Sequence, residues 1–465
     1  MNIRQAIKQI SGFNYIVNSL NIRSSAGRKQ LFSLPFLTNG DDIETALDET
    51  ETAVGIVNAP ENEKRLSILF SKLMQLHDIS GTIRILSDKN ILDDVELFEI
   101  KYFALLAESI REHAGQLKIS FIDIPSLAKV IDILDPEKKR IPHFYVYDQY
   151  SPDLASLRAQ LNRMPDQGYS EQEIEQARLQ AQQLEDEIRK KITQQLYPHA
   201  RALLKALHEI ARLDVVLAKA CQTKELGLCK PAIGDKKTFY TGLFHPEIRN
   251  LLRQQHKDFQ PVDISIPMQP TVITGANMAG KSVLLKSVAL AQTMMQFGFY
   301  VAAQSAAIIP VEQIVINVSD GEDELKGLSS FAAEMLRLNT TIDNTRQHIS
   351  QLVLIDELAR TTNPTEGKAI VCGILDFFIQ HNVQSLITTH YGIDMPCRKL
   401  RVKGFTENKN NEKITIDNIN SFIDYSLEET TEKEVPHEAV KIAEIIGVNA
   451  AILERAKKYL KNDVQ

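Results

Sequence analysis

The chain has 465 residues, 43% of them hydrophobic and 24% charged, which is ordinary for a globular protein of roughly two to four domains. Its formal net charge of −7 argues against a protein that mainly coats nucleic acid, because such proteins are usually basic. The four cysteines form no C-x-x-C pair and no apolar run resembles a signal peptide or a membrane span, so we expect a reducing, cytoplasmic location without membrane contact.

Residues 1 to about 140 are predicted to be mostly helical. Asp41 and Asp42 mark a helix start. Apolar or small residues then recur every three or four positions, as in Ile43, Leu47, Thr50 and Val54, and again in Leu66, Leu69, Leu73 and Leu76. This spacing is typical of helices that pack one face into a core.

Residues 151–222 are predicted to form a helical arm. Ser151-Pro152 opens a helix that runs to Met164, and residues 165–168 break it. An apolar seam at spacings of three and four then follows at Ile174, Ala177, Ala181, Leu184 and Ile188. This seam is typical of a short coiled coil, and we expect a returning helix after Pro198. A solvated single helix is the alternative.

Residues 231–465 are predicted to form an α/β domain, preceded by an all-α domain over residues 1–230. Short β-rich runs alternate with helical stretches at residues 263–266, 271–274, 352–355 and 385–388. Such alternation favours a sheet covered by helices. Another strand is expected at residues 422–427, and the last 25 or so residues return to helix.

The strand at residues 271–274 leads into a full match to the phosphate-binding pattern G-x-x-x-x-G-K-[ST]. The matching residues are Gly275, Ala276, Asn277, Met278, Ala279, Gly280, Lys281 and Ser282, and Val283 follows them in a predicted helix. Backbone N–H groups and the helix dipole would hold the phosphates, Lys281 would reach the β- and γ-phosphates, and Ser282 would ligate magnesium. The pattern predicts a P-loop that binds ATP and Mg²⁺; a glycine turn that happens to end in Lys-Ser is the alternative.

A pair of acids ends the apolar strand at residues 352–355. Asp356 can hold the magnesium ion, directly or through water, and Glu357 can polarise the water that attacks the γ-phosphate. Two acids that cap a helix are the alternative, which the upstream P-loop makes weaker. His390 ends the next strand and could approach the γ-phosphate, because ligands bind at the carboxyl ends of strands in open α/β sheets. A structural histidine is the alternative there.

These motifs, in this order, resemble those of the MutS family of ATPases, which are related to ABC-type ATPases. The resemblance rests on residues 274–282, 327–335, 354–358 and 388–391. Weaker likeness extends to residues 20–35, 150–154 and 439–460, which resemble the family's helical core, lever entry and dimerising helices. The resemblance implies a mixed ABC-like sheet with flanking helices, behind a helical core and lever domain.

The resemblance also implies a homodimer in which each ATPase domain completes the site of the other. Ser329 and Ser330 would then approach the γ-phosphate that the partner binds; from the residues alone, Ser329 is only a plausible helix N-cap. Asn277 would lie in the phosphate loop. Phe259 matches the adenine-stacking position, although a core phenylalanine is the alternative.

The chain also departs from the family. Ala279 replaces a common glycine, and residues 363–367, Asn-Pro-Thr-Glu-Gly, look more like paralogues that do not read mismatches. We expect no mismatch-recognition, connector or clamp domain. Only about 20–30 residues separate the lever helices, and residues 166–187 carry seven acids and one base, which is unfavourable for binding phosphates.

Two functions remain open at this point. One is a MutS-like ATPase that switches its arms in DNA binding or repair-related processing. The other is an ATPase that remodels or reactivates a protein client without binding DNA. A nucleotide-gated scaffold with negligible turnover is a third, against which Lys281 and Glu357 argue.

Overall fold

The computed structural model describes residues 1–275, 280–317, 330–360, 362–405, 419–431, 440, 443–444 and 447–462. The chain divides into two compact units. We call Asn21–Leu34 with Glu49–Cys221 the helical unit, and Met1–Leu20, Pro35–Asp48 and Gln222–Gln465 the sheet unit. No helix within the described ranges combines the length and the apolar character needed to cross a membrane.

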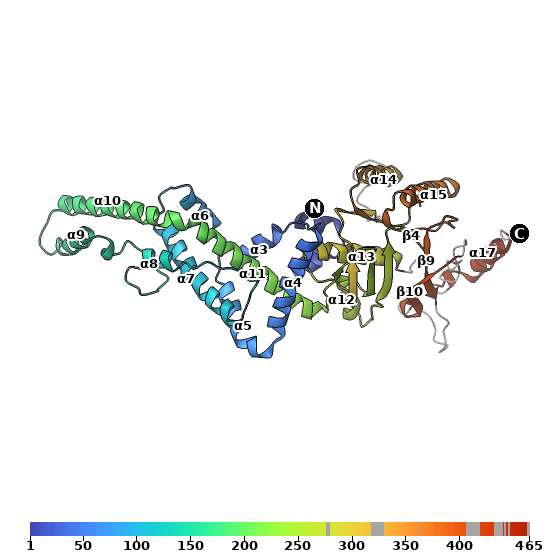
Figure 1. Cartoon of the computed structure of the whole chain (residues 1–465), viewed down its shortest axis with the longest axis horizontal. Coiled ribbons are helices and arrows are strands. Elements are labelled where there is room, and N and C mark those ends of the chain that lie inside the picture. Colours follow the sequence, from blue (N-terminus) through green and yellow to red (C-terminus); the bar gives the residue numbers. More distant parts are fainter. Residues whose placement is uncertain are drawn as a thin grey trace. The chain divides into compact units, whose positions relative to one another are not determined.

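The helical unit is built from consecutive helices (Figure 1). In chain order they are α3 (Ser25–Phe32), the second part of α4 (Gly40–Asn58), α5 (Glu63–Leu73), α6 (Ser80–Ser87), α7 (Asp94–Gln116), α8 (Ala128–Leu134), α9 (Pro152–Arg163), α10 (Glu171–Leu196) and the first part of α11 (Ala200–Leu226). The predicted apolar stripes lie inside: Leu66, Leu69, Leu73 and Leu76 are all buried. The helical period read from the sequence is therefore confirmed for Leu66, Leu69 and Leu73 in α5, whereas Leu76 is buried just after that helix ends.

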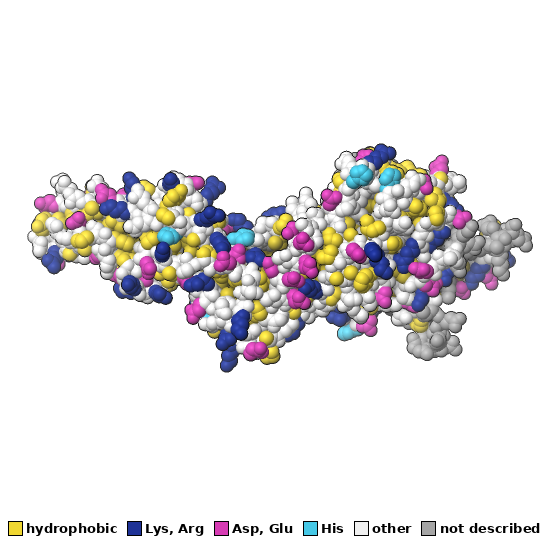
Figure 2. All heavy atoms as spheres, viewed as in Figure 1, with side chains coloured by type: hydrophobic (Ala, Val, Ile, Leu, Met, Phe, Trp, Pro, Cys, Tyr) yellow, Lys and Arg dark blue, Asp and Glu magenta, His cyan; other side chains and the backbone are white. Residues whose placement is uncertain are grey.

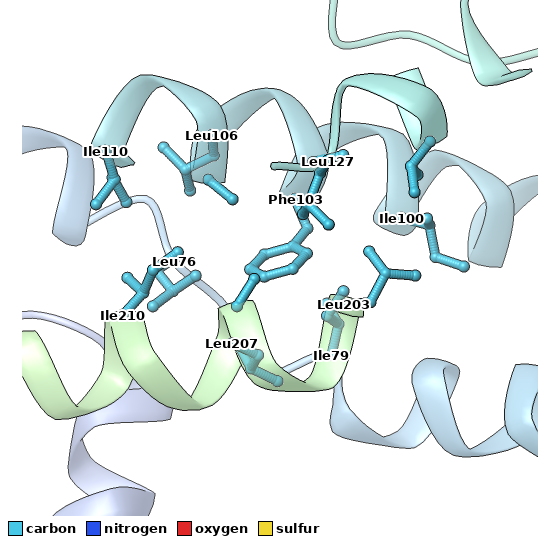
Figure 3. Close-up of a cluster of buried hydrophobic side chains, with 14 of the residues drawn as sticks. Leu76, Ile79, Ile100, Phe103, Leu106, Ile110, Leu127, Leu203, Leu207 and Ile210 are labelled. Carbon is cyan, nitrogen blue, oxygen red and sulfur yellow. The ribbon is translucent and has the colours of Figure 1, made fainter. Parts of the chain in front are cut away.

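The core of this unit lies between α7 and α11. Phe103 occupies its middle, with Leu106 and Ile110 along α7 and Leu203 and Leu207 facing them from α11 (Figure 3). All five side chains are buried. Burying each one contributes roughly 1.5–3 kcal/mol, so this contact stabilises the unit more than any surface ion pair can.

The arm consists of α9 and α10, which pack against each other. Ser151 caps α9, and the buried seam of α10 includes Ala177, Ala181 and Ile188. The predicted helix after Pro198 is confirmed as α11, but the chain does not reverse its direction there. Leu196, Tyr197 and Ala200 keep helical dihedral angles through the short 3-10 turn Tyr197–His199, because proline is tolerated in the first turn of a helix. The reversal lies at residues 164–170, between α9 and α10.

The sheet unit contains a mixed six-stranded sheet in the order β10-β9-β4-β8-β7-β6. Its strands are β4 (Pro270–Thr274), β6 (Gln313–Asn317), β7 (Gln351–Ile355), β8 (Gln384–Thr388), β9 (Arg398–Phe405) and β10 (Ile423–Glu429). All neighbours pair in parallel except β10, which is antiparallel to β9. The parallel strands therefore end at one edge, and their carboxyl ends bring residues from distant parts of the chain together.

A smaller sheet and the helices complete this unit. The sheet has the order β1-β5-β2-β3, from β1 (Ala232–Ile233), β2 (Lys237–Leu243), β3 (Val262–Pro267) and β5 (Ser305–Ile308). The helices are α1 (Ile3–Gln9), α2 (Phe13–Asn18), α12 (Pro246–Gln254), α13 (Lys281–Gln296), α14 (Ser330–Arg346), α15 (Pro364–Gln380) and α17 (Ala450–Asn462). Leu338 of α14 and Val371, Leu375 and Phe378 of α15 pack into one core with residues of β4, β7 and β8.

The first 20 residues belong to the sheet unit, whereas the sequence placed the whole of residues 1–230 in the helical domain. Phe13 stacks on Phe297 with ring centroids 5.6 Å apart and meets Phe299 edge-on at 6.2 Å. Gly12 fits against His245, whose ring leaves no room for a Cβ atom. These contacts join residues more than two hundred positions apart, which sequence periodicity does not report.

Candidate nucleotide-binding site

The residues predicted to bind phosphate lie between β4 and α13, and the strand before them and the helix after them are confirmed. Gly280 has φ +74°, and an added Cβ would come within 2.9 Å of the Tyr425 ring, so both conformation and space require glycine. Lys281 is the first residue of α13, is 5% exposed, and donates a hydrogen bond from Nζ to the Gly275 carbonyl at 2.6 Å. The predicted residues Ala276, Asn277, Met278 and Ala279 lie outside the described ranges.

Ser282 and Asp356 meet at the edge of the sheet. The Ser282 hydroxyl donates to Oδ2 of Asp356, and the Thr388 hydroxyl donates to Oδ1 at 2.6 Å. The Asp356 N–H donates to the Asn317 carbonyl at 2.9 Å. Strand pairing explains the convergence: β7 lies between β6 and β8, and β8 lies beside β4, so the ends of all four strands share one edge.

Glu357 lies next to this pair and is 18% exposed. Its Oε1 is 2.7 Å from Nε2 of His390, and its Oε2 is bound by Arg360. Burial alone would raise the pKa of the Glu357 carboxyl, but the Arg360 hydrogen bond and the charge of His390 outweigh burial and hold this pKa below its ordinary value. Glu357 is therefore an anion at neutral pH, as a base that orients water must be.

The backbone at the acid pair is held in an uncommon conformation. Glu357 has φ +51° and Ala359 has φ +59°, values that non-glycine residues adopt rarely. The Thr388 hydroxyl fixes this turn by accepting the Glu357 N–H at 2.8 Å. Strained backbone that its surroundings fix in this way is typical of functional sites.

Helix α14 is bound to this turn through Glu334 and to the end of β6 through Arg337. Glu334 accepts a hydrogen bond from the Ala359 N–H at 3.3 Å, and burial raises the pKa of Glu334. Arg337 donates to Oδ1 of Asn317 at 2.8 Å. Of the two predicted serines, Ser329 lies outside the described ranges and Ser330 is the first residue of α14. A displacement of α14 would therefore disturb the backbone that positions Asp356 and Glu357.

A cavity of about 670 Å³ opens beside the start of α13. Its walls include the predicted residues Phe259, Gly280, Lys281 and Val283, and they extend to Leu252, His256, Val402, Ile423 and Tyr425. Aromatic and aliphatic side chains next to a buried lysine are what a nucleotide site needs, with an apolar space for a base and a cation for its phosphates. Phe259 is half-buried and lines this cavity.

One wall of the cavity is fixed by a polar contact across β10. Gln260 donates to Asp424 at 2.8 Å and accepts from the Tyr425 N–H at 3.1 Å. Asp424 also accepts the Ser426 N–H at 2.9 Å. Burial works against ionisation, but these hydrogen bonds outweigh it and lower the pKa of Asp424 to about 2. This reciprocal contact holds the Tyr425 ring against Gly280.

Several of these residues were missed by sequence reasoning. Tyr425 and Ile423 were read only as a strand in a polar region, although a tyrosine in such a strand is a recognisable signal. Arg360 lies just before the segment 363–367 that departs from the family and was given no role. Gly367 of that segment has a clear reason, since a Cβ there would lie 2.3 Å from the Tyr391 hydroxyl, which itself donates to the Ala359 carbonyl at 3.0 Å.

The residues present fit Mg²⁺ together with a phosphate. In the part of the chain that the structure describes, no group of three or more His, Cys, Asp or Glu could hold a metal ion. Ser282 and Asp356 instead offer one hydroxyl and one carboxylate, already in hydrogen-bond contact. Mg²⁺ is commonly held by one or two protein oxygens together with substrate phosphates and water, rather than by a closed protein cage.

Comparison with known proteins agrees with this geometry. Residues 271–463 match the family model described as MutS domain V. The chain is 34% identical over 186 residues to the endonuclease MutS2 of Thermus thermophilus, covering 40% of this chain and 24% of that protein. It is 24% identical over 478 residues to the DNA mismatch repair protein MutS of Fusobacterium nucleatum, covering 99% and 51% respectively.

A third relative is the DNA mismatch repair protein MutS of Methanosarcina barkeri, 25% identical over 458 residues, with 93% of this chain and 48% of that protein covered. The chain thus spans between about a quarter and a half of the length of these relatives. The matched domain contains the whole described site except Gln260 and the rest of the cavity wall that precedes residue 271. The chain is therefore similar to MutS proteins over nearly all of its length, and its residues 271–463 match their domain V.

Proposed function

We propose that this protein binds ATP with Mg²⁺ in the sheet unit and hydrolyses it. The observation that supports this most directly is the convergence of Lys281, the hydrogen-bonded pair Ser282 and Asp356, and the pair Glu357 and His390 at one sheet edge. A buried lysine, oxygen ligands for a cation and a base are the three groups that phosphoryl transfer to water requires.

Each residue has a distinct role in this proposal. Lys281 leaves the Gly275 carbonyl and neutralises the β- and γ-phosphates. Ser282 and Asp356 hold Mg²⁺, which when bound neutralises phosphate charge. Glu357 accepts a hydrogen bond from the attacking water and orients it, while His390 keeps Glu357 in place and lies toward the γ-phosphate. The backbone of residues 275–280 with the first turn of α13 supplies N–H donors for the phosphates.

The adenine base occupies the cavity beside α13. Phe259 and Tyr425 present aromatic rings to this space, and Val283 and Ile423 add aliphatic contacts. Offset stacking between a base and an aromatic ring contributes roughly 0.5–1.5 kcal/mol beyond the burial of area. The Gln260–Asp424 contact holds Tyr425 in place in the cavity wall. The Tyr425 side chain is therefore mostly ordered before the nucleotide binds.

A homodimer completes the site in this proposal. Ser329 and Ser330 reach the γ-phosphate bound by the partner, and Glu334 and Arg337 of α14 transmit the contact to the acid pair. The C-terminal helix α17 supports dimerisation, since Ile452 and Tyr459 lie on one face of it and are both exposed.

The domain organisation serves a switch. ATP-driven closure of the dimer moves the helical unit, with its core, lever and arm, relative to the sheet unit that binds ATP. DNA binding or repair-related processing is the favoured output, because the named relatives include DNA mismatch repair proteins and an endonuclease.

Remodelling of a protein client in the cytoplasm is the second candidate, and the acidic arm favours it. Asp166, Glu171 and Glu173 are exposed at the tip. Toward the base of the arm, Arg158 and Arg189 neutralise Glu185 and Asp186, so the acidity is concentrated at the tip.

A gel-shift titration with duplex, mismatched and four-way-junction DNA, at two salt concentrations, distinguishes DNA binding from the remodelling of a protein client. Absence of binding at low salt would favour the protein client.

Nucleotide binding is tested with Lys281→Ala. Removing the amine should weaken the affinity for a fluorescent ATP analogue by about 100-fold or more, since an uncompensated triphosphate would remain beside the sheet. Lys286→Ala, in the same helix, is the matched control and should stay within a few-fold of the parent. An unchanged affinity in a folded Lys281→Ala protein would remove the basis for the phosphate-loop assignment.

A further inference from the structure

The loop between α8 and α9 combines positive charge with exposed rings. Within residues 136–145 the sequence is Pro-Glu-Lys-Lys-Arg-Ile-Pro-His-Phe-Tyr, which we call the basic loop. Lys138, Arg140 and His143 are exposed, Ile141 is 53% exposed and Tyr145 is 42% exposed. Large apolar and aromatic side chains are seldom left in water next to cations without a reason, so this composition indicates a contact surface.

The start of the basic loop is fixed from inside the helical unit. Asp135 is buried and forms an ion pair with Lys101 at 3.0 Å. Its other oxygen accepts the Arg140 N–H at 2.7 Å, and its carbonyl accepts the Lys138 N–H at 2.9 Å. Lys138 and Arg140 have φ of +56° and +51°. The carboxylate of Asp135 therefore holds Arg140, and its backbone carbonyl holds Lys138, in backbone conformations that these residues would rarely adopt by themselves.

The end of the loop is fixed just as firmly. Tyr147 is buried, accepts a hydrogen bond from Lys101 at 2.9 Å and donates its own to the His143 carbonyl at 2.9 Å. Tyr145 rests on Tyr147 with ring centroids 4.2 Å apart, and His143 meets Tyr145 edge-on at 5.4 Å. The exposed rings therefore sit on a buried ring and are held before any partner binds.

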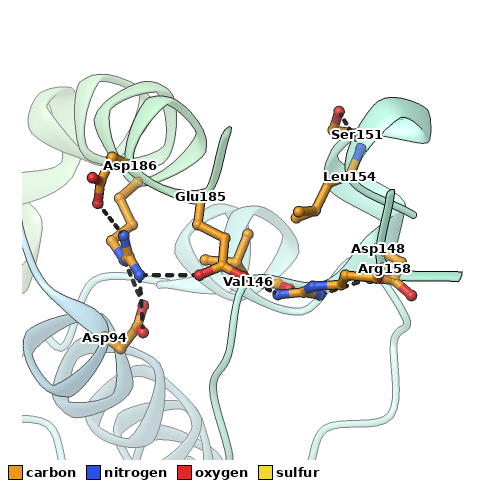
Figure 4. Close-up of polar contacts among 9 residues, drawn as sticks. Asp94, Val146, Asp148, Ser151, Leu154, Arg158, Glu185 and Asp186 are labelled. Carbon is orange, nitrogen blue, oxygen red and sulfur yellow. Dashed lines mark hydrogen bonds and ion pairs between the residues drawn. The ribbon is translucent and has the colours of Figure 1, made fainter. Parts of the chain in front are cut away.

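The arm holds the last part of this segment. Arg158 of α9 donates to the Val146 carbonyl at 2.7 Å and also binds Asp148 and Glu185, as the dashed lines in Figure 4 show. Glu185 belongs to α10, so both arm helices contribute to fixing the residues that follow Tyr145. A loop held from both sides loses little conformational entropy when it binds.

The charges of the basic loop are available to a partner. Lys139 is paired with Glu137 at 2.7 Å, whereas neither the Lys138 amine nor the Arg140 guanidinium forms an ion pair with any residue in the described ranges. The adjacent groove is less favourable to an anion, because Glu112 and Asp132 line it together with Lys72 and Arg140. Basic and acidic side chains are also interspersed over the face drawn in Figure 2. The positive region is therefore short.

We propose that the basic loop binds nucleic acid, with Lys138 and Arg140 on two phosphates and the Tyr145 ring, supported by His143, stacked on an unpaired base. Cations that bind phosphates beside a rigid exposed ring are the usual means of binding single-stranded segments. A short patch favours an unpaired segment over a long duplex, which needs a broad basic surface. This inference extends the DNA-linked part of the proposed function. It rests on that part alone and not on ATP hydrolysis.

Fluorescence anisotropy with labelled strands of about 20 nucleotides tests the proposal on the full chain. Three nucleic acids are compared at roughly 50 and 200 mM salt: single-stranded DNA, RNA of the same sequence, and duplex DNA. Lys138→Glu with Arg140→Glu should weaken single-strand binding by about 10-fold or more and lower the slope of log K against log salt by about 1.4, the value for two phosphates. Tyr145→Ala should weaken binding by roughly 5- to 100-fold and leave that slope unchanged.

The matched control reverses two other bases of the helical unit, Arg84 and Lys118, which are exposed; Lys118 also has positive φ. Arg84→Glu with Lys118→Glu should stay within about two-fold of the parent. Lys138→Gln with Arg140→Gln gives a second pair that removes charge without reversing it, and thermal unfolding confirms that each variant is folded.

Three results would overturn the proposal. In the first, the parent binds no strand at low salt. In the second, the loop variants bind as tightly as the control variant. In the third, polyglutamate displaces the bound strand and Tyr145→Ala has no effect on binding. The last would assign the loop to an acidic protein. ATP affinity, measured on the same samples, should equal that of the parent in all loop variants. Loss of nucleotide binding by the parent itself would refute the ATPase function and leave the loop result standing.

Discussion

Two carboxylates, Asp135 in the helical unit and Glu357 in the sheet unit, show how one kind of interaction serves two purposes. Both are held by basic side chains, and both have a pKa below the ordinary value because hydrogen bonds and charge outweigh the opposing effect of burial. Asp135 is 2% exposed, and its partner Lys101 is 1% exposed. Glu357 is bound by His390, 34% exposed, and Arg360, 65% exposed.

The difference lies in whether the partners can leave. Breaking the Lys101–Asp135 pair strands a charge in an apolar core, so this pair is fixed and holds the basic loop in place. Arg360 and His390 reach solvent, so they can exchange Glu357 for a phosphate or a water at little cost. A buried pair therefore maintains structure, while a pair that reaches solvent can take part in a reaction cycle.

The largest effect is expected from Glu357→Gln. The amide keeps the size of the side chain but cannot act as a base, so kcat should fall by roughly 10²- to 10⁴-fold. ATP affinity should be retained, and the ATP-bound dimer should accumulate, as measured by light scattering. Glu366→Gln, an exposed acid at the start of α15, is the control. Hydrolysis at the parent rate would show that Glu357 does not activate water.

Lys101→Met should have the largest effect on stability. It leaves Asp135 buried without its cation, and we expect the helical unit to lose about 3–5 kcal/mol in the free energy of unfolding. Urea denaturation followed by circular dichroism measures this loss, with Lys118→Met as the exposed control. Adding Asp135→Asn to Lys101→Met should restore part of the stability. If Lys101→Met unfolds like the parent, the comparison between the two carboxylates fails.

Asp424→Asn tests a third carboxylate, one that holds the wall of the cavity. The folded-state pKa of Asp424, about 2, lies below the ordinary value, so its stabilisation is complete above about pH 4 and disappears as the pH falls toward 2. The variant should lose roughly 1–2 kcal/mol at neutral pH and show a flatter dependence of the unfolding temperature on pH below 4. ATP affinity should fall a few-fold as Tyr425 loosens. Equal pH profiles would contradict the assignment.

The smallest effect is expected from Arg360→Gln. Since Arg360 is mostly exposed, the free energy of unfolding should change by less than about 1 kcal/mol. Without the guanidinium the pKa of Glu357 should rise, so the acidic limb of the profile of kcat against pH should move to higher pH. Arg346→Gln, which removes an exposed arginine from α14, should leave the profile in place. A limb that stays put would mean that Arg360 does not bind Glu357 in the working enzyme.

Local sequence patterns were enough to locate most helices and strands and to place the predicted phosphate-binding turn between a strand and a helix. The strand at residues 271–274, the glycine turn and α13 follow each other directly, and each is specified by the backbone preferences and polarity of adjacent residues. The same is true of the strand before Asp356 and of the strand before His390. The helical stripes at Leu66 to Leu76 and Ala177 to Ile188 were readable for the same reason, because burial on one face repeats with the helical period.

Only the tertiary structure decided how distant segments meet. Because β10 pairs with β9 and β9 pairs with β4, Tyr425 lies against Gly280, some 145 positions earlier in the chain. Packing of Phe13 on Phe297 transfers the first helices to the sheet unit. A lysine such as Lys101 looks like any solvent-exposed base in the sequence until Asp135 and Tyr147 surround it. Such contacts depend on which surfaces are buried together, and the period of a single element carries no information about its partner.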